Sequence, residues 1–298
     1  MQEQQQPDNF SLGKLTFGWL ILGLLCLLGI VTWLHFHIHE PKVSNAIIAG
    51  GVAALATAAG TLPVLFSSNI SQRVQDSMLG FGAGVMLAAC AFSLIIPGID
   101  AGKALELSKW MSGVLVGISI IAGAATLFAI EHYAPHEHFI IGSHTDLEKK
   151  RSLSRTWLFV FAVALHNLPE GFAIGVSYAG TDTLQASALA SGIAIQNIPE
   201  GMVVALALVA VGYHRSTAIL LGVASGIIEP IGAFLGAWIF NFSQFLLPWG
   251  LGFAGGAMLF VISHEMIPES HRKGHEAYAT SGLILGFVLM MLLDTSLG

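Results

Sequence analysis

Apolar residues run in long blocks along this chain, and short polar stretches separate them. A helix of roughly 20 apolar residues is long enough to cross the hydrocarbon core of a bilayer. Nine blocks reach about that length, namely 15–36, 44–66, 76–97, 110–130, 156–179, 184–211, 216–240, 245–267 and 277–297. The pattern predicts an all-α polytopic membrane protein with the lipid bilayer as its surroundings.

The first block could also be the apolar part of a signal peptide. A single cation, Lys14, precedes it and no small-residue cleavage site follows, so we expect an uncleaved helix. We therefore divide the chain into residues 1–43, a cytoplasmic N-terminus with an extra helix, and residues 44–298, a core of eight helices. The long polar loop at 131–155 is rich in histidine and charge and has no packed-core pattern.

Composition agrees with burial in lipid. Only 10% of the 298 residues are charged, whereas soluble domains carry about 25%. The 34 glycines suit close packing of membrane helices, and Gly-rich faces are compatible with a homodimer. Cys26 and Cys90 both lie in apolar blocks and give no disulfide framework. We predict no nucleic-acid partner.

The distribution of Lys and Arg predicts the orientation, because cytoplasmic loops carry an excess of both. With the N-terminus in the cytoplasm, nine crossings put the C-terminus outside. The inner side then holds Lys14, Arg73, Lys149, Lys150, Arg151, Arg155, Arg215, Arg272 and Lys273, and the outer side holds Lys42, Lys103 and Lys109. The His-rich loop falls in the cytoplasm.

Two internal repeats are visible. Residues 79–87 read LGFGAGVML and residues 251–259 read LGFAGGAML, and both blocks continue to an Ile-Pro pair. Five crossings separate the two copies, so the repeat is inverted. A second pair, HNLPEG at 166–171 and QNIPEG at 196–201, lies on consecutive helices and is inverted as well. Inverted repeats with polar residues near the membrane midplane are typical of secondary transporters.

The paired motifs place polar groups where they are costly, inside apolar helices. Residues three or four apart share a helix face, so each motif presents a carboxylate beside an amide or imidazole. Each proline removes a backbone donor and frees a carbonyl one turn earlier. Glu229 follows in the next helix, beside Pro230. The candidate ligands are His166, Asn167, Glu170, Gln196, Asn197, Glu200 and Glu229.

A divalent cation would compensate these acids, which have no Lys or Arg partner in their spans. Mixed nitrogen and oxygen ligands without thiolate suit Zn²⁺, Fe²⁺, Mn²⁺ or Cd²⁺. Seven candidate ligands exceed the four of a tetrahedral zinc ion, which indicates two adjacent metals bridged by Glu170 and Glu200. The alternative is an interhelical hydrogen-bond network, which amides alone would fit.

The two xNxPEG motifs and the following Glu-Pro resemble the ZIP family of divalent-metal transporters, in its GufA-type bacterial branch, and the resemblance covers the chain from about residue 44. It implies eight core helices in a 3+2+3 arrangement of inverted repeats. It also implies a bacterial inner membrane, transport toward the cytoplasm and an elevator-like movement of the helices that carry the site. Zn²⁺ is the first expectation for the substrate, with Cd²⁺ as another.

The resemblance further implies two metal positions. His166, Glu170, Gln196 and Glu200 would form one, and Asn167, Asn197 and Glu229 with the bridging glutamates would form the other. Some close relatives carry Asp where this chain has Asn197. The amide removes one negative charge, and our hypothesis is that the second position is weaker or ancillary here.

Further residues would line the path on either side. The family resemblance implies an entrance at Asp100, with Ser93 and Met86 on the same helix. On the cytoplasmic side, Ser-His-Glu at 263–265 is expected to end the seventh core helix. The residues expected on the release path are His264, Glu265, Glu269, His271 and His275.

Three other function classes are alternatives to a carrier. His264-Glu265 begins like the HExxH motif of metalloproteases, but Pro268 occupies the position of the second histidine, which disfavours an intramembrane metallohydrolase. No Walker A pattern appears, which disfavours an ATP-driven pump. A metal-gated channel or sensor with the same ligands stays open.

Overall fold

The computed structural model describes residues 29, 31–32, 40–67, 70–133, 166–210 and 212–297. Most of the predicted first helix, the His-rich loop beyond residue 133 and the beginning of the fifth predicted helix lie outside the described residues. Residues 29, 31 and 32 of the first predicted helix are helical.

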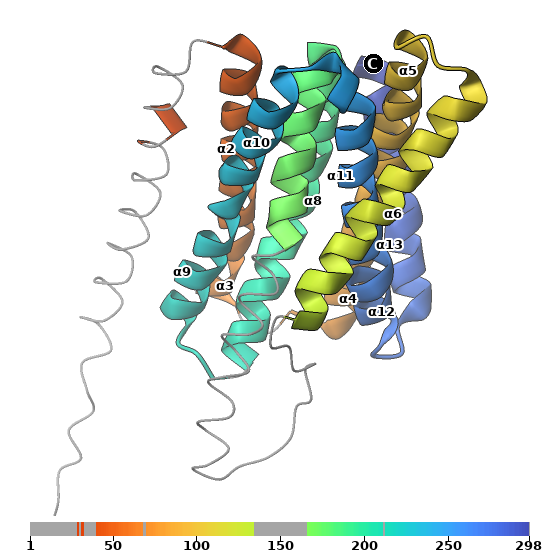
Figure 1. Cartoon of the computed structure of the whole chain (residues 1–298). Coiled ribbons are helices and arrows are strands. Elements are labelled where there is room, and N and C mark those ends of the chain that lie inside the picture. The colour runs from red at the N-terminus through yellow and green to blue at the C-terminus, as the bar shows by residue number, and fades with distance from the viewer. Residues whose placement is uncertain are drawn as a thin grey trace, which may run out of the picture.

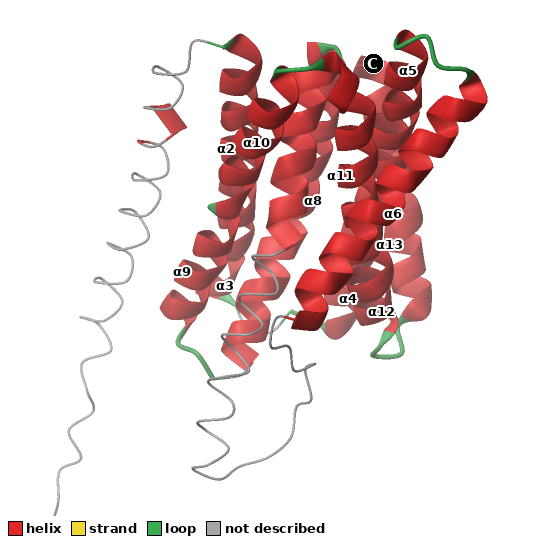
Figure 2. Ribbon diagram, viewed as in Figure 1, coloured by secondary structure: helices red, strands yellow, loops and turns green. Residues whose placement is uncertain are grey.

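The described residues form helices throughout and contain no strand (Figure 2). Seven helical segments are long and apolar enough to cross a membrane, at 41–66, 72–104, 109–132, 183–210, 215–241, 244–271 and 276–297. Each corresponds to one predicted span. Of the fifth predicted span, residues 166–180 are described and are helical. An all-helical membrane protein is thereby confirmed.

Several of these segments are built from more than one element. Their bounds are α2 (Pro41–Thr61), α3 (Pro63–Phe66), α4 (Gln72–Ala89), η1 (Cys90–Ile95), α5 (Ile96–Ala104), α6 (Lys109–Tyr133), α8 (Thr183–Ala210), α9 (Arg215–Gly226), α10 (Ile228–Asn241), η2 (Gln244–Leu246), α11 (Leu247–Val261), η3 (Ile262–Met266), α12 (Ile267–His271) and α13 (Glu276–Leu297).

The π-helical elements η1 and η3 fall at equivalent places in the 79–87 and 251–259 repeats, each just before an Ile-Pro pair. Pro97 and Pro268 then lie in the first turn of α5 and α12, where a missing N–H removes no helical bond. The expectation that the helix ends at Ser-His-Glu 263–265 is therefore wrong. The segment passes through these residues and continues to His271.

Four helix pairs dominate the packing: α4 lies on α13, α11 lies on α6, and α2 lies on both α8 and α10. Figure 1 shows α4–α5 and α11–α12 running in opposite directions across the bundle. Glycines allow the helix backbones to meet. A Cβ on Gly84 would lie 1.9 Å from the carbonyl oxygen of Leu283, and one on Gly256 would lie 2.0 Å from that of Ile120.

Gly84 and Gly256 occupy the same place in the two LGF repeats, and each receives the carbonyl of a partner helix. The two copies therefore pack alike, α4 against α13 and α11 against α6. The full 3+2+3 arrangement and the count of eight core helices plus one stay predictions.

Candidate metal centre

Three helices supply the predicted ligands. Residues 166–180 carry His166, Asn167 and Glu170, α8 carries the second motif, and Glu229 lies in the first turn of α10. A negative charge is favoured there because the N-terminal end of a helix carries a partial positive charge. The candidate ligands that are buried, each at most 1% exposed, are Asn167, Glu170, Gln196, Asn197 and Glu229.

The glycines that end the two motifs bring these helices into contact. A Cβ on Gly171 would lie 2.1 Å from the carbonyl oxygen of Glu229, so residues 166–180 meet α10 at its start. A Cβ on Gly201 would lie 2.1 Å from the carbonyl oxygen of Thr57, so α8 meets α2. Gly171 and Gly201 therefore have equivalent roles. Each lets the helix that carries a motif contact a neighbouring helix beside the candidate ligands.

Glu229 is held by two donors. The Thr57 hydroxyl donates to its Oε1 at 2.8 Å, and the Asn197 side-chain amide donates to its Oε2 at 2.8 Å. The same amide reaches the carbonyl oxygen of Ala53 at 3.3 Å. Gln196 Nε2 donates to Asn197 Oδ1. Asn197 and Glu229, which we assigned to one metal position, thus contact each other directly.

The three acids lie near one another. Glu170 interacts electrostatically with Glu200 and with Glu229, and the Gln196 side chain interacts with the carboxyl groups of both Glu170 and Glu200. Among the described residues, no Lys or Arg forms an ion pair with any of the three glutamates. A buried set of acids without a basic partner attracts a cation.

Unpartnered polar atoms concentrate at this place. Seven buried side-chain nitrogen or oxygen atoms of the described residues lack a hydrogen-bond partner, and five of them belong to Asn167 (both atoms), Glu170, Gln196 and Glu200. Each such atom costs about 1–3 kcal/mol unless it is compensated. Four of the five are oxygens of carboxylates or amides, and oxygen ligands of this kind suit a divalent transition metal.

Acids and imidazoles alone do not form a ready ligand cage. Within the described ranges, no three His, Cys, Asp or Glu side chains are grouped so that they could hold a metal ion. One reason is the direction of His166, whose Nε2 lies 2.7 Å from Oε1 of Glu265 in η3. A metal at this place would need the amides of Asn167 and Gln196 as further donors, and His166 could offer this nitrogen only on leaving Glu265.

Glu265 lies closer to the ligands than its sequence position suggested, because it pairs with His166. Its neighbour His264 pairs instead with Glu131 of α6, at 3.1 Å between Nε2 and Oε1. Sequence reasoning missed Glu131. The available signal was an acid at the end of the apolar block 110–130.

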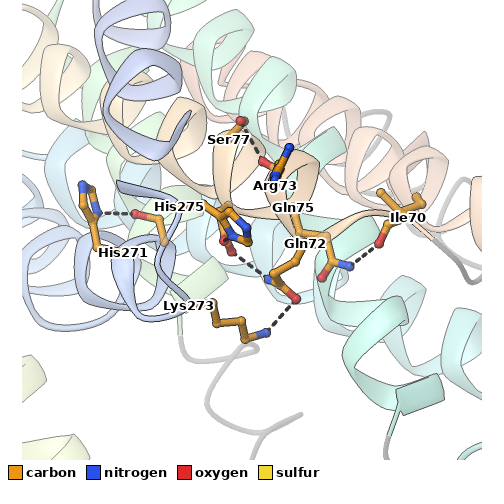
Figure 3. A network of polar contacts seen from close by, with 10 residues as sticks. Ile70, Gln72, Arg73, Gln75, Ser77, His271, Lys273 and His275 are labelled. Atoms are coloured by element: carbon orange, nitrogen blue, oxygen red, sulfur yellow. Dashed lines mark hydrogen bonds and ion pairs between the residues drawn. The ribbon is translucent and has the colours of Figure 1, made fainter. Parts of the chain in front are cut away.

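The remaining release residues lie apart from the ligands and have partners of their own. His275 Nδ1 lies 2.8 Å from Oδ2 of Asp76. The other oxygen of Asp76, Oδ1, accepts a hydrogen bond from the Gln72 side-chain amide (Figure 3). Lys273 donates to Gln72, so the turn before α13 is tied to the start of α4. Of the other two release residues, Glu269 forms an ion pair with Arg272, and Nε2 of His271 contacts the Thr280 hydroxyl.

The predicted entrance residues lie on η1 and on the helices beside it. Asp100 forms an exposed ion pair with Lys103, and Met86 is buried in the core. The buried Ser93 hydroxyl donates to Asp294 of α13 at 2.7 Å. Asp294 was missed, although it is the single acid in the apolar block 277–297 and could have been found on that ground.

Comparison with known proteins shows the family. A family model described as ZIP zinc transporter matches residues 136–294. The chain belongs to the ZIP family. Zinc transporter ZIPB of Bordetella bronchiseptica is 47% identical over 275 residues, which is 92% of this chain and 88% of that protein. Zinc transporter GufA of Myxococcus xanthus is 44% identical over 85% of this chain and 98% of its own.

A more distant relative, zinc transporter ZIP11 of Bos taurus, is 30% identical over 88% of this chain and 99% of its own. The identities to ZIPB and GufA confirm the GufA-type bacterial branch. A ZIP protein is a transporter rather than an enzyme, which removes the metallohydrolase from the alternatives.

Proposed function

We propose that this ZIP protein carries Zn²⁺ across the bacterial inner membrane into the cytoplasm. The observation that carries the proposal is the concentration of unpartnered buried atoms on the twin motifs, where five of seven such atoms gather. A cation that passes through this place meets oxygen donors that have no hydrogen-bond partner to give up. The names of the relatives agree, since each is called a zinc transporter.

The site is binuclear. One position uses His166, Glu170, Gln196 and Glu200, and the other uses Asn167, Asn197 and Glu229 with Glu170 and Glu200 as bridges. The proximity of Glu170 to both other acids supports this bridging role. The donors are oxygen and imidazole nitrogen, so Cd²⁺, Fe²⁺ and Mn²⁺ are further substrates.

Movement is by alternating access, with an elevator-like shift of the helices that carry the ligands. Residues 166–180, α8 and α10 hold the ligands, while Glu265 belongs to a different segment, 244–271. The 2.7 Å pair between His166 and Glu265 crosses from one group of helices to the other. In this mechanism the pair breaks when the ligand helices shift and forms again on return.

The experiment is Zn²⁺ uptake into proteoliposomes. The wild type is compared with a Glu170→Ala, Glu200→Ala double variant and with a control, Glu276→Gln, in which an exposed acid at the start of α13 changes. We expect saturable uptake in the wild type and the control, and none in the double variant. Equal uptake in all three would contradict the proposed path, and uptake that never saturates would indicate a channel.

A further inference from the structure

Glu229 differs from the other two acids of the centre in having a partner for each oxygen. Glu170 and Glu200 each keep one unpartnered oxygen, whereas Glu229 accepts from the Thr57 hydroxyl at one oxygen and from the Asn197 amide at the other. The position of this carboxylate is therefore set by its neighbours before any ion arrives. Asn197 is a predicted ligand, but Thr57 is not.

Thr57 is itself fixed in place. Its side chain is 1% exposed, its carbonyl oxygen faces Gly201, and its Cβ lies 3.1 Å from where a Cβ on Gly226 would stand. Two glycines thus let α8 and the end of α9 close on this residue. A hydroxyl held by backbone packing on both sides can orient a carboxylate with little freedom of its own.

The Thr57 hydroxyl has a second possible acceptor, the carbonyl oxygen of Ala53. Thr57 Oγ1 lies 3.3 Å from the carbonyl oxygen of Ala53, one turn earlier in α2, and 2.8 Å from Glu229. A hydroxyl has one hydrogen, and the shorter contact favours the carboxylate. Because a carboxylate has about four lone-pair sites, Glu229 can keep this hydrogen bond while it also binds a cation.

We propose that Thr57 is a positioning residue for the second metal position, one that aims Glu229 and keeps its hydrogen bond to this carboxylate when an ion binds. The inference rests on the proposed two-metal function. It assigns to α2, which supplies none of the predicted ligands, a direct part in how tightly the second ion is held.

The test is titration of the purified full-length protein with Zn²⁺ by calorimetry, together with the bound metal per protein. The variants are Thr57→Val, which keeps the shape but lacks the hydroxyl, and Thr57→Ser, which keeps the hydroxyl. The matched control is Thr61→Val, one turn later in α2, because Thr61 is equally buried and its hydroxyl donates only to the backbone carbonyl of Ala58.

We expect two binding steps in the wild type. In Thr57→Val the weaker step should lose about tenfold in affinity, the effect expected when a carboxylate loses one hydrogen bond, while the tighter step is unchanged. Thr57→Ser and Thr61→Val should bind like the wild type. If the valine variant does not purify in folded form, Thr57→Ala removes the hydroxyl without adding bulk and takes its place.

Three results would overturn the role of Thr57 while leaving the transport function intact. They are two unchanged steps in Thr57→Val, equal weakening in Thr57→Ser, and equal weakening in Thr61→Val. A wild-type protein that binds a single ion would overturn both the two-metal proposal and the role of Thr57. A wild-type protein that binds no Zn²⁺ would contradict the proposed function itself.

Discussion

At the scale of single residues, Asn197 is the most informative of the candidate ligands because its amide donates directly to one of the buried acids, Glu229. Its Nδ2 donates to Glu229 and to the carbonyl oxygen of Ala53. A carboxylate in its place could do neither. The amide therefore stabilises the protein before metal binds, at the expense of one negative charge for the second ion.

The loss of a donor and the gain of a charge predict opposite effects of Asn197→Asp on stability without and with bound metal. Without metal the variant loses a donor and places two like charges together, so it should unfold more easily by about 1–3 kcal/mol. With Zn²⁺ or Cd²⁺ the added charge should tighten the second position, and the gain in melting temperature on adding metal should exceed that of the wild type.

Thermal unfolding in detergent, with and without each ion, measures both effects. Asp182→Asn, an exposed change outside the centre, serves as the control. If Asn197→Asp melted like the wild type under both conditions, and bound metal with the same affinity and selectivity, the hypothesis of a weaker second position would be wrong.

The buried polar cluster that holds the seven candidate ligands could be predicted from the sequence, because polar groups inside apolar blocks are rare and most of these occur in two matching sets. Thr57 could not be predicted, since a threonine in an apolar helix usually bonds to its own backbone. Its contact with Glu229 joins residues 172 positions apart. Only the fold brings them together, through the close approach of α2 to α10 that Gly50 allows.

At the scale of elements, hydropathy predicted the helices but could not predict their internal breaks. The blocks at 76–97 and 245–267 are longer segments that contain η1 and η3, because a π-helical turn changes the hydrogen-bond register and leaves hydropathy unaltered. The sequence likewise placed a helix end at Ser-His-Glu 263–265, whereas these residues lie inside the segment.

Helix contact through glycine gives a prediction at this scale. Gly201→Ala would put a Cβ 2.1 Å from the carbonyl oxygen of Thr57, and the clash is with backbone, so α2 and α8 must separate. We expect a loss of about 1–3 kcal/mol in stability from overpacking and a large loss of transport, because the separation moves α2 away from Asn197, which donates to Ala53 of α2. Apparent melting temperature and Zn²⁺ uptake measure the two effects.

Gly113→Ala in α6 is the matched control. No atom lies within 4 Å of the place where its Cβ would stand, and alanine is favoured over glycine inside a helix by about 0.5–1 kcal/mol. This variant should match or exceed the wild type in stability. If Gly201→Ala did the same and transported normally, close contact of α2 with α8 would have no part in the function.

At the scale of the whole molecule, the basic residues separate by end. Figure 1 places the starts of α4 and α9 and the α12–α13 turn at one end of the bundle, and the α5–α6 turn and the start of α2 at the other. The first end carries Arg73, Arg215, Arg272 and Lys273, and the second carries Lys42, Lys103 and Lys109. Because excess positive charge stays in the cytoplasm, the first end should face inward.

This orientation puts the Asp76–His275 pair on the cytoplasmic side and Asp100 outside, as the predicted release path and entrance require. Single cysteines at Lys109 and Lys273 test it, in a background that carries Cys26→Ser and Cys90→Ala. Both positions are exposed. In intact cells a membrane-impermeant maleimide should label Lys109→Cys at once, and should label Lys273→Cys only after the membrane is opened. The reverse pattern would invert the topology and exchange the sides of the predicted entrance and release path, while labelling of both in intact cells would mean that neither end is sealed from the outside.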